Sequence, residues 1–361
     1  MSGTPWPLVP SLLALLGMAV VIVVVGVRLT RIADTLSERT GLGDAVGGAL
    51  LLGAVTSLPG NVTVLTGALE GDPGFALGNP IGGIALQTVW LAIADLVYRR
   101  ANLEHAAASL ENVLQSVILS AMLAIPVIGY ATPGLQLGWF HPLSLLIPIL
   151  YGYGLRLLRK MREEPMWQPT KTDQTADDDT GESNGNGNGN GNGNGNRNAE
   201  DEDPYAGTST RGMWGRLAAL GLVVGVAGWI VGRAGLGVVA ATGLDSGLVG
   251  FTLTTAISSL PELVVLIAAI RLGQLTLGVG NIVGGNVYDV LMITIADLAY
   301  LDGPLYRNAG PTSLVLLGGT LLMTAVLAGG LILRDRKWIG FEGISIPLIY
   351  LGTVALVFAS G

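Results

Sequence analysis

Long apolar segments separated by short charged connections dominate the pattern of this chain. Lys, Arg, Asp and Glu are absent from residues 1–27, 45–69, 73–94, 112–155, 217–232, 308–333 and 343–361. A helix that crosses a bilayer needs roughly 20 mostly apolar residues. The 112–155 stretch is about twice that length and is interrupted by Thr132-Pro133-Gly134, so it predicts two helices.

Two further stretches, 247–270 and 275–299, are uncharged except for Glu262, Asp289 and Asp297. Together the segments predict an all-α membrane protein with ten transmembrane helices, centred near residues 18, 57, 85, 121, 147, 224, 258, 287, 321 and 351. The first segment is not expected to be a cleaved signal, because no Lys or Arg precedes it and no Ala-x-Ala site follows it.

Composition narrows the function classes. Half of the 361 residues are hydrophobic and only 12% are charged, against about 25% in soluble domains, which excludes an ordinary soluble enzyme. The chain has no cysteine, so disulfides and thiolate chemistry are excluded. A net charge of −7 argues against nucleic-acid binding. No zinc-protease or serine-hydrolase motif is present, and His105 and His141 are expected to be interfacial, so no enzyme is predicted.

The basic residues indicate an orientation. If the N-terminus lies outside, all but two of the 19 Lys and Arg fall on the cytoplasmic side, the exceptions being Arg233 and Arg307. Basic residues favour cytoplasmic loops. We therefore expect a multi-pass protein of the plasma membrane with both termini extracellular and no basic residue inside a span.

An acidic, Asn/Gly-rich linker at residues 163–212 separates an N-terminal half, 1–162, from a C-terminal half, 213–361. It holds an alternating Asn-Gly run from Asn184 to Asn196 between two acidic clusters. Such a stretch buries too little apolar surface to fold alone. We interpret it as a solvated cytoplasmic tether, and a Ca²⁺-sensing loop is the alternative.

The two halves contain an internal repeat. Residues 53–98 and 255–300 align without a gap at an offset of 202, with 15 of 46 positions identical. The shared positions include Ser-Leu-Pro and Gly-Asn-x-x-Gly-Gly, which unrelated apolar helices would not share at fixed spacing. Five predicted spans in each half invert the second copy relative to the first. Inverted repeats with broken helices at the midplane are typical of secondary transporters.

The repeats also carry candidate chemistry. Among all 26 Asp and Glu, only Glu262 and Asp289 are predicted deep in the bilayer, where an ionisable residue indicates a functional site. Pro59 and Pro261 fall in the middle of their predicted spans, and the carbonyls that they free need other partners. Carboxylates, hydroxyls and carbonyls form an all-oxygen site, which suits Ca²⁺ and Na⁺.

The two segments resemble the α-repeats of the cation/calcium exchanger superfamily, which includes the sodium/calcium exchangers. That family has roughly Gly-Thr-Ser-x-Pro-Glu on one helix and Gly-Asn-x-x-Gly-Ser-Asn-x-x-Asn/Asp on the next. The resemblance implies that the acidic ligands are Glu262 and Asp289. It also implies hydroxyl or carbonyl ligands from Thr56, Ser57, Ser258 and Ser259, with Gln87 opposite Asp289. Asp95 and Asp297 are expected to be solvated at helix ends and outside the site.

The first repeat departs from this pattern. Gly60 stands where the family has Glu, Gly82-Gly83-Ile84 replaces Gly-Ser-Asn, and Gln87 replaces Asn or Asp. Pro80 is foreign to the pattern, and in the second repeat Gly285 replaces a serine. An amide oxygen from Asn61 or a water would have to fill the place beside Gly60.

The resemblance predicts Na⁺/Ca²⁺ antiport in a lipid bilayer by a protein that functions as a monomer. Ca²⁺ and Na⁺ are then transported ions, and no resident cofactor is expected. Gly60 keeps a second hypothesis open, which is a proton-coupled or monovalent cation exchanger with altered stoichiometry. A non-transporting membrane sensor that reads Ca²⁺ through the acidic loop is a third.

Overall fold

The computed structural model describes residues 4–40, 53–97, 110–163, 207–272, 275–333 and 340–360. Every named element in these ranges is a helix. Leu137 and Phe140 form an isolated β-bridge within the connection that follows residue 131. Residues 164–206, which are most of the predicted linker, lie outside the described residues, as do His105 and the side chain of Asp95. The all-α prediction is confirmed for the described part of the chain.

The helices follow the predicted apolar segments. In the N-terminal half they are α1 (Leu8–Thr40), α3 (Leu58–Leu69), α4 (Pro73–Val97), α6 (Leu110–Ala131), η1 (Pro142–Leu145) and α7 (Leu146–Glu163). In the C-terminal half they are α8 (Thr210–Thr242), α9 (Ser246–Val249), η2 (Gly250–Thr254), α10 (Thr255–Ser258), α11 (Leu260–Leu272), α12 (Leu275–Asp289), α13 (Leu291–Ala299), α14 (Leu305–Asn308), α15 (Pro311–Leu333) and α16 (Phe341–Ser360). The break at Thr132-Pro133-Gly134 is confirmed, because α6 ends at Ala131.

Seven helices in the described ranges are long and apolar enough to cross a membrane, and an eighth span results if the bent pair Ser246–Ser258 and Leu260–Arg271 counts as one. Two predicted spans do not meet this criterion. The α3 helix has only 12 residues, and the last five residues of α7 are the charged sequence Arg-Lys-Met-Arg-Glu. Length and composition therefore support a multi-pass membrane protein, whereas the count of ten stays a prediction.

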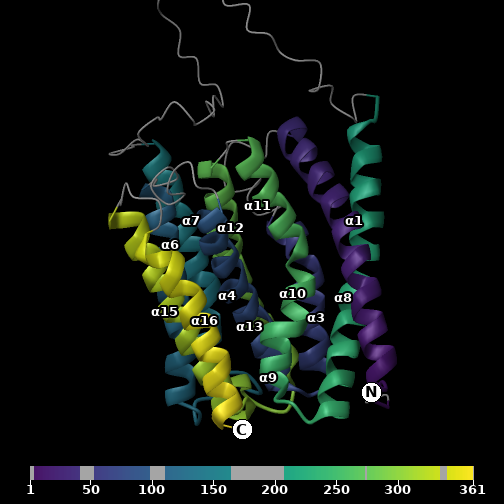
Figure 1. Cartoon of the computed structure of the whole chain (residues 1–361), viewed down its shortest axis with the longest axis vertical. Helices are drawn as coiled ribbons and strands as arrows, with labels where there is room; N and C mark the ends of the chain where they lie inside the picture. Colours follow the sequence, from purple (N-terminus) through teal and green to yellow (C-terminus); the bar gives the residue numbers. More distant parts are fainter. Residues whose placement is uncertain are drawn as a thin grey trace, which may run out of the picture.

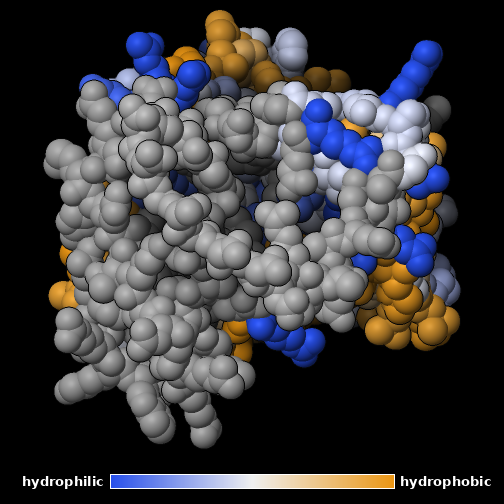
Figure 2. Space-filling model, turned by 90° about the horizontal axis from the view of Figure 1, so that it is seen from above, coloured by the Kyte–Doolittle hydropathy of each residue, from blue (hydrophilic) through white to orange (hydrophobic). Residues whose placement is uncertain are grey.

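The outer surface of the bundle is apolar. On α1, Leu13, Leu16 and Val20 are 65%, 68% and 64% exposed. Soluble monomers rarely expose contiguous apolar surface of this kind. Seen from above, hydrophobic residues lie along the sides of the molecule and hydrophilic residues lie at the end that faces the viewer (Figure 2). This distribution fits a helix bundle whose sides contact lipid.

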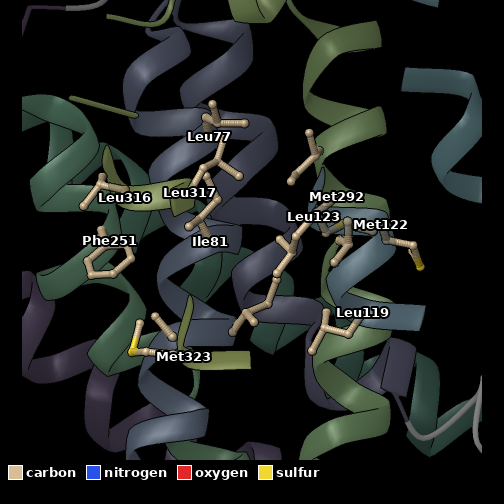
Figure 3. Close-up of a cluster of buried hydrophobic side chains, with 14 of the residues drawn as sticks. Leu77, Ile81, Leu119, Met122, Leu123, Phe251, Met292, Leu316, Leu317 and Met323 are labelled. Carbon is tan, nitrogen blue, oxygen red and sulfur yellow. The ribbon is translucent and has the colours of Figure 1, made fainter. Parts of the chain in front are cut away.

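The largest buried cluster joins α4, α6, η2, α13 and α15. Its side chains include Leu77, Ile81, Leu123, Met292 and Leu317, which pack together in the interior of the bundle (Figure 3). Their burial fixes α4, which carries Gln87 of the predicted site, and α13, which begins two residues after Asp289 at the end of α12.

The long helices α1 and α8 lie side by side along one edge of the bundle (Figure 1). Each packs closely on the other half: a side chain at Gly26 of α1 would collide with Pro261, and a side chain at Gly228 of α8 would collide with Pro59. Gly26 and Gly228 are 202 positions apart, and so are Pro59 and Pro261, which is the offset of the repeat. The two halves therefore contact each other reciprocally.

Arg233, which is expected on the outer side of the membrane, lies within a helix, because α8 continues to Thr242. A helix of 33 residues is about 50 Å long at 1.5 Å per residue, which exceeds the hydrocarbon core. Arg233 forms an ion pair of 2.6 Å with Glu70 at the end of α3, so it does not serve as a partner for Glu262.

Candidate functional site

Both repeats begin with a broken helix. In the first, residues 53–56 are helical, Ser57 forms a bend, and Pro59 is the second residue of α3. In the second, the axis turns by 51° between α10 and α11, with Ser259 at the break and Pro261 as the second residue of α11. Proline lacks the amide hydrogen that would continue the preceding helix but is well suited to the first turn of the next. The mid-span prolines therefore lie at the starts of half-helices.

The two breaks face one cavity of about 20 Å³. A space of this size holds one or two water-sized occupants. It is lined by Ser57, Gly60, Asn61, Val64, Asn79, Pro80, Gly83, Gln87, Ser258, Ser259, Glu262, Asp289 and Met292. Six of the seven predicted site residues are in this set, so the structure brings together positions that are about 200 apart in the sequence.

Asp289 is held by side chains of the first repeat. The hydroxyl of Ser57 donates a hydrogen bond of 2.7 Å to Oδ1, and Nε2 of Gln87 donates one of 3.2 Å to Oδ2. A Cβ atom at Gly83 would lie 3.3 Å from Oδ2, so the glycine leaves room for this approach. The carboxylate of Asp289 is thereby oriented at the interface between the repeats.

Glu262 contrasts with Asp289. It is 5% exposed, lies in the first turn of α11, and its Oε2 has no hydrogen-bond partner. The Oε1 atom of Gln87 is also buried without a partner. Buried polar oxygens are normally satisfied, and an unsatisfied one suggests a missing ligand such as a water or an ion. Two such acceptors on the same small cavity are suited to coordinate a cation.

The place beside Gly60 is bordered by neutral oxygens. A Cβ atom built on Gly60 would lie 3.6 Å from Oγ of Ser258 and 3.7 Å from Oδ1 of Asn79. Asn79 is fixed by two hydrogen bonds, from its Nδ2 to Thr254 at 2.9 Å and from Thr255 to its carbonyl at 2.9 Å. Asn61 also lines the cavity and contacts the Tyr288 hydroxyl at 3.5 Å.

Thr56 is the one predicted residue that does not line the cavity. Its hydroxyl donates to the carbonyl of Gly53 at 3.2 Å. Conversely, the sequence prediction did not include Asn79 in the site. The repeated Gly-Asn pair at residues 78–79 and 280–281 was a signal for it, although Asn281 is not in the lining.

Asp297 is buried, contrary to the prediction that it is solvated, and His141 is buried beside it. Both are 0% exposed. Asp297 accepts hydrogen bonds from the backbone amides of His141 and Leu305 at 2.8 and 2.6 Å and from the Ser144 hydroxyl at 2.6 Å. The prediction failed because the segments around residues 141 and 305 fold over the end of α13. Asp297 lies outside the cavity and ties three segments together.

Two curated relatives match part of the chain. The sodium/calcium exchanger MaX1 of Methanosarcina acetivorans is 26% identical over 117 residues, which are 32% of this chain and 32% of that protein. The putative antiporter CaxA of Alkalimonas amylolytica is 30% identical over 123 residues, which are 33% of this chain and 37% of that protein. The matches thus span about a third of the length of each relative.

Solved structures share the fold over nearly the whole chain. The H⁺/Ca²⁺ exchanger CAX superposes with a TM-score of 0.66 at 14% identity, covering 99% of this chain and 86% of that one. The sodium-calcium exchanger NCX_Mj superposes with a TM-score of 0.56 at 18% identity, covering 96% and 99%. The family described as sodium/calcium exchanger protein matches residues 10–155 and 212–359, which is most of the sequence. This protein therefore belongs to the sodium/calcium exchanger family, within the cation/calcium exchanger superfamily.

Proposed function

We propose that this protein is a secondary-active cation antiporter that exchanges Na⁺ for Ca²⁺ by alternating access at the cavity between its repeats. Its family is one of membrane exchangers and not of enzymes. The observation that carries the proposal is the unpartnered, buried Oε2 of Glu262, which belongs to a cavity where hydroxyl, amide and carboxylate groups of both repeats meet. A dehydrated cation would satisfy these oxygens.

Each ligand has a proposed role. Glu262 and Asp289 supply the negative charge, and Ser57 and Gln87 orient Asp289 through the hydrogen bonds described above. Ser258 and Ser259, at the break before α11, supply hydroxyl or carbonyl oxygens. Thr56 contributes through its backbone, since its side chain bonds to Gly53. Hard cations favour such oxygen ligands.

The architecture that we propose is ten spans in two inverted halves, residues 1–162 and 213–361, joined by the cytoplasmic linker 163–212. The gapless repeat and the reciprocal contacts of Gly26 with Pro261 and of Gly228 with Pro59 support the pseudo-symmetry. The N- and C-termini lie at the same end of the bundle (Figure 1), as an even number of spans requires. All cavity residues come from one chain, so a monomer embedded in lipid is sufficient.

We propose a plasma-membrane location with both termini outside. The chain has no cysteine, so single cysteines can report topology without further changes. Asp302→Cys, in the exposed turn after α13, should react with a membrane-impermeant maleimide added to intact cells. Lys171→Cys, in the linker, should react only after permeabilisation. The opposite labelling would reverse the proposed orientation.

Flux through proteoliposomes tests the antiport. Ca²⁺ uptake should follow an outward Na⁺ gradient in the native protein and should disappear in Glu262→Gln, because the amide keeps the volume but removes the charge. Glu111→Gln, in the first turn of α6 and outside the cavity, is the matched control and should transport normally. Undiminished exchange by Glu262→Gln would refute the site.

A second candidate is a proton-coupled or monovalent cation exchanger, and Gly60 favours it because the cavity lacks the carboxylate that the family pattern has there. The same proteoliposomes distinguish the two. Uptake of Ca²⁺ that needs a pH gradient and ignores Na⁺ would identify the proton-coupled exchanger. Na⁺-driven uptake at equal pH on both sides would identify the first candidate.

A further inference from the structure

We infer that the site exchanges one divalent cation for two monovalent cations, so that no net charge crosses the membrane, and that Gly60 keeps the fixed charge of the site at the value that this exchange needs. The inference rests on the antiport function proposed above and specifies its stoichiometry. It follows from the charges of the cavity, from the room beside Gly60 and from the size of the space.

The cavity contains two ionisable side chains. Among its 13 lining residues only Glu262 and Asp289 carry a charge, and none is Lys, Arg or His. Within the described part of the chain, no group of three or more Asp, Glu or His converges on a common point. Arg233 on α8 does not line the cavity and is paired with Glu70 at 2.6 Å. The fixed charge available to bound cations is therefore −2.

Charge balance then selects what can be carried. A net charge is costly in the low-dielectric interior of a membrane protein. The loaded site should therefore switch most readily between its inward-open and outward-open states when the charges of the bound cations sum to +2. One divalent cation satisfies this condition in one direction, and two monovalent cations satisfy it in the other. A third monovalent cation would leave an uncompensated positive charge.

Gly60 is the position where a third anion could stand. A Cβ atom there makes only ordinary van der Waals contacts, at 3.6 Å with Oγ of Ser258 and 3.7 Å with Oδ1 of Asn79. The side chain would start from the wall of the cavity, which Gly60 lines. Glycine thus leaves neutral oxygens in place of a carboxylate. The volume of about 20 Å³, enough for one or two water-sized occupants, also suits two monovalent cations better than three.

The experiment measures the Ca²⁺ gradient at equilibrium in proteoliposomes, with the monovalent cation that drives uptake held at a known ratio and the membrane potential clamped by K⁺ and valinomycin. We expect the Ca²⁺ ratio to equal the square of the monovalent ratio and to be the same at every potential. A cubic relation would overturn the inference. In that case one net charge would cross with each Ca²⁺, and the equilibrium Ca²⁺ ratio would change by about 50-fold per 100 mV of membrane potential.

Two variants test the role of Gly60. Gly60→Glu adds a third negative charge, which one divalent cation or two monovalent cations no longer neutralise. A neutral load would need a further cation in a cavity that suits one or two occupants, so Ca²⁺ uptake by Gly60→Glu should be much slower than by Gly60→Gln. Gly60→Gln adds nearly the same volume without charge and should keep the square relation. Uptake by Gly60→Glu as fast as by Gly60→Gln would overturn the assignment to Gly60. The wild-type measurement decides the ratio independently of either variant, and a wild-type protein without any exchange would instead refute the proposed function.

Discussion

The side-chain amide of Gln87 donates a hydrogen bond of 3.2 Å to the carboxylate of Asp289, and these two residues occupy equivalent positions of the two repeats, 202 residues apart. The contact therefore lies where the pseudo-symmetry brings α4 and α12 together. One member is neutral and donates, and the other is anionic and accepts. Two identical anions in this position would repel each other, so the sequence difference between the repeats is what allows the pair to form.

Gln87→Glu tests this relationship. Two like charges about 4 Å apart repel by about 4 kcal/mol at an effective dielectric constant of 20. We expect the unfolding temperature in detergent to fall without divalent cations and to recover in millimolar Ca²⁺, because a bound cation stabilises the folded state by mass action. Gln87→Met, which adds no charge, is the control. An equal loss of stability with and without Ca²⁺ would contradict the prediction.

Ser57→Ala should weaken Ca²⁺ binding without unfolding the protein. Its hydroxyl donates the 2.7 Å bond to Asp289, and a hydrogen bond to a charged group contributes about 1.5–3 kcal/mol. We expect the half-saturating Ca²⁺ concentration to rise roughly 10- to 100-fold. Thr56→Ala is the control, because the Thr56 hydroxyl bonds to the Gly53 carbonyl instead, and its effect should be much smaller. A larger effect at Thr56 would reverse the assignment.

Asp297→Asn should lower stability without changing ion selectivity. Asp297 accepts three hydrogen bonds from His141, Ser144 and Leu305. The asparagine amide would turn a donor toward another donor and leave buried groups unpaired, at a cost of about 1–3 kcal/mol for each unsatisfied group. Chemical or thermal unfolding in detergent measures the loss. Asp302→Asn, in the exposed turn nearby, should be nearly neutral, and equal effects of the two changes would argue against the network.

The ion pair between Arg233 and Glu70 should be worth more than a surface pair. The two side chains are only 12% and 21% exposed, and removing one partner leaves a charge in a poorly solvated place. We expect Arg233→Met to lower the unfolding free energy by about 2–4 kcal/mol. The double change with Glu70→Gln should recover a large part of this loss. Additive losses in the double-mutant cycle would show that the pair contributes little.

Much of this molecule follows from local sequence patterns. Apolar length predicts the helices, and Thr132-Pro133-Gly134 predicts the end of α6 because the residue before proline disfavours helix. Of the 13 cavity residues, Glu262 and Asp289 stand out by their place in otherwise uncharged segments, and four more follow from the resemblance of the repeats to the cation/calcium exchanger superfamily. The helices and the two carboxylates depend on hydrophobicity, proline and charge, which act along the chain.

Other features depend on contacts between distant segments. The sequence placed Asp297 in solvent and did not place Arg233 within a helix, because neither the fold of residues 141 and 305 over α13 nor the length of α8 is a local property. It also did not identify Asn79 as a cavity residue or distinguish Ser57, which bonds to Asp289, from Thr56, which does not.

The sequence by itself determined the all-α membrane class, the duplication and the identity of the two carboxylates that line the cavity, since hydrophobicity, charge and helix length are set by residue type. Only the tertiary structure decided which oxygens face the shared cavity and which are already bonded. That choice depends on the rotation and crossing of helices from opposite halves, which the packing of Gly26 on Pro261 and of Gly228 on Pro59 fixes.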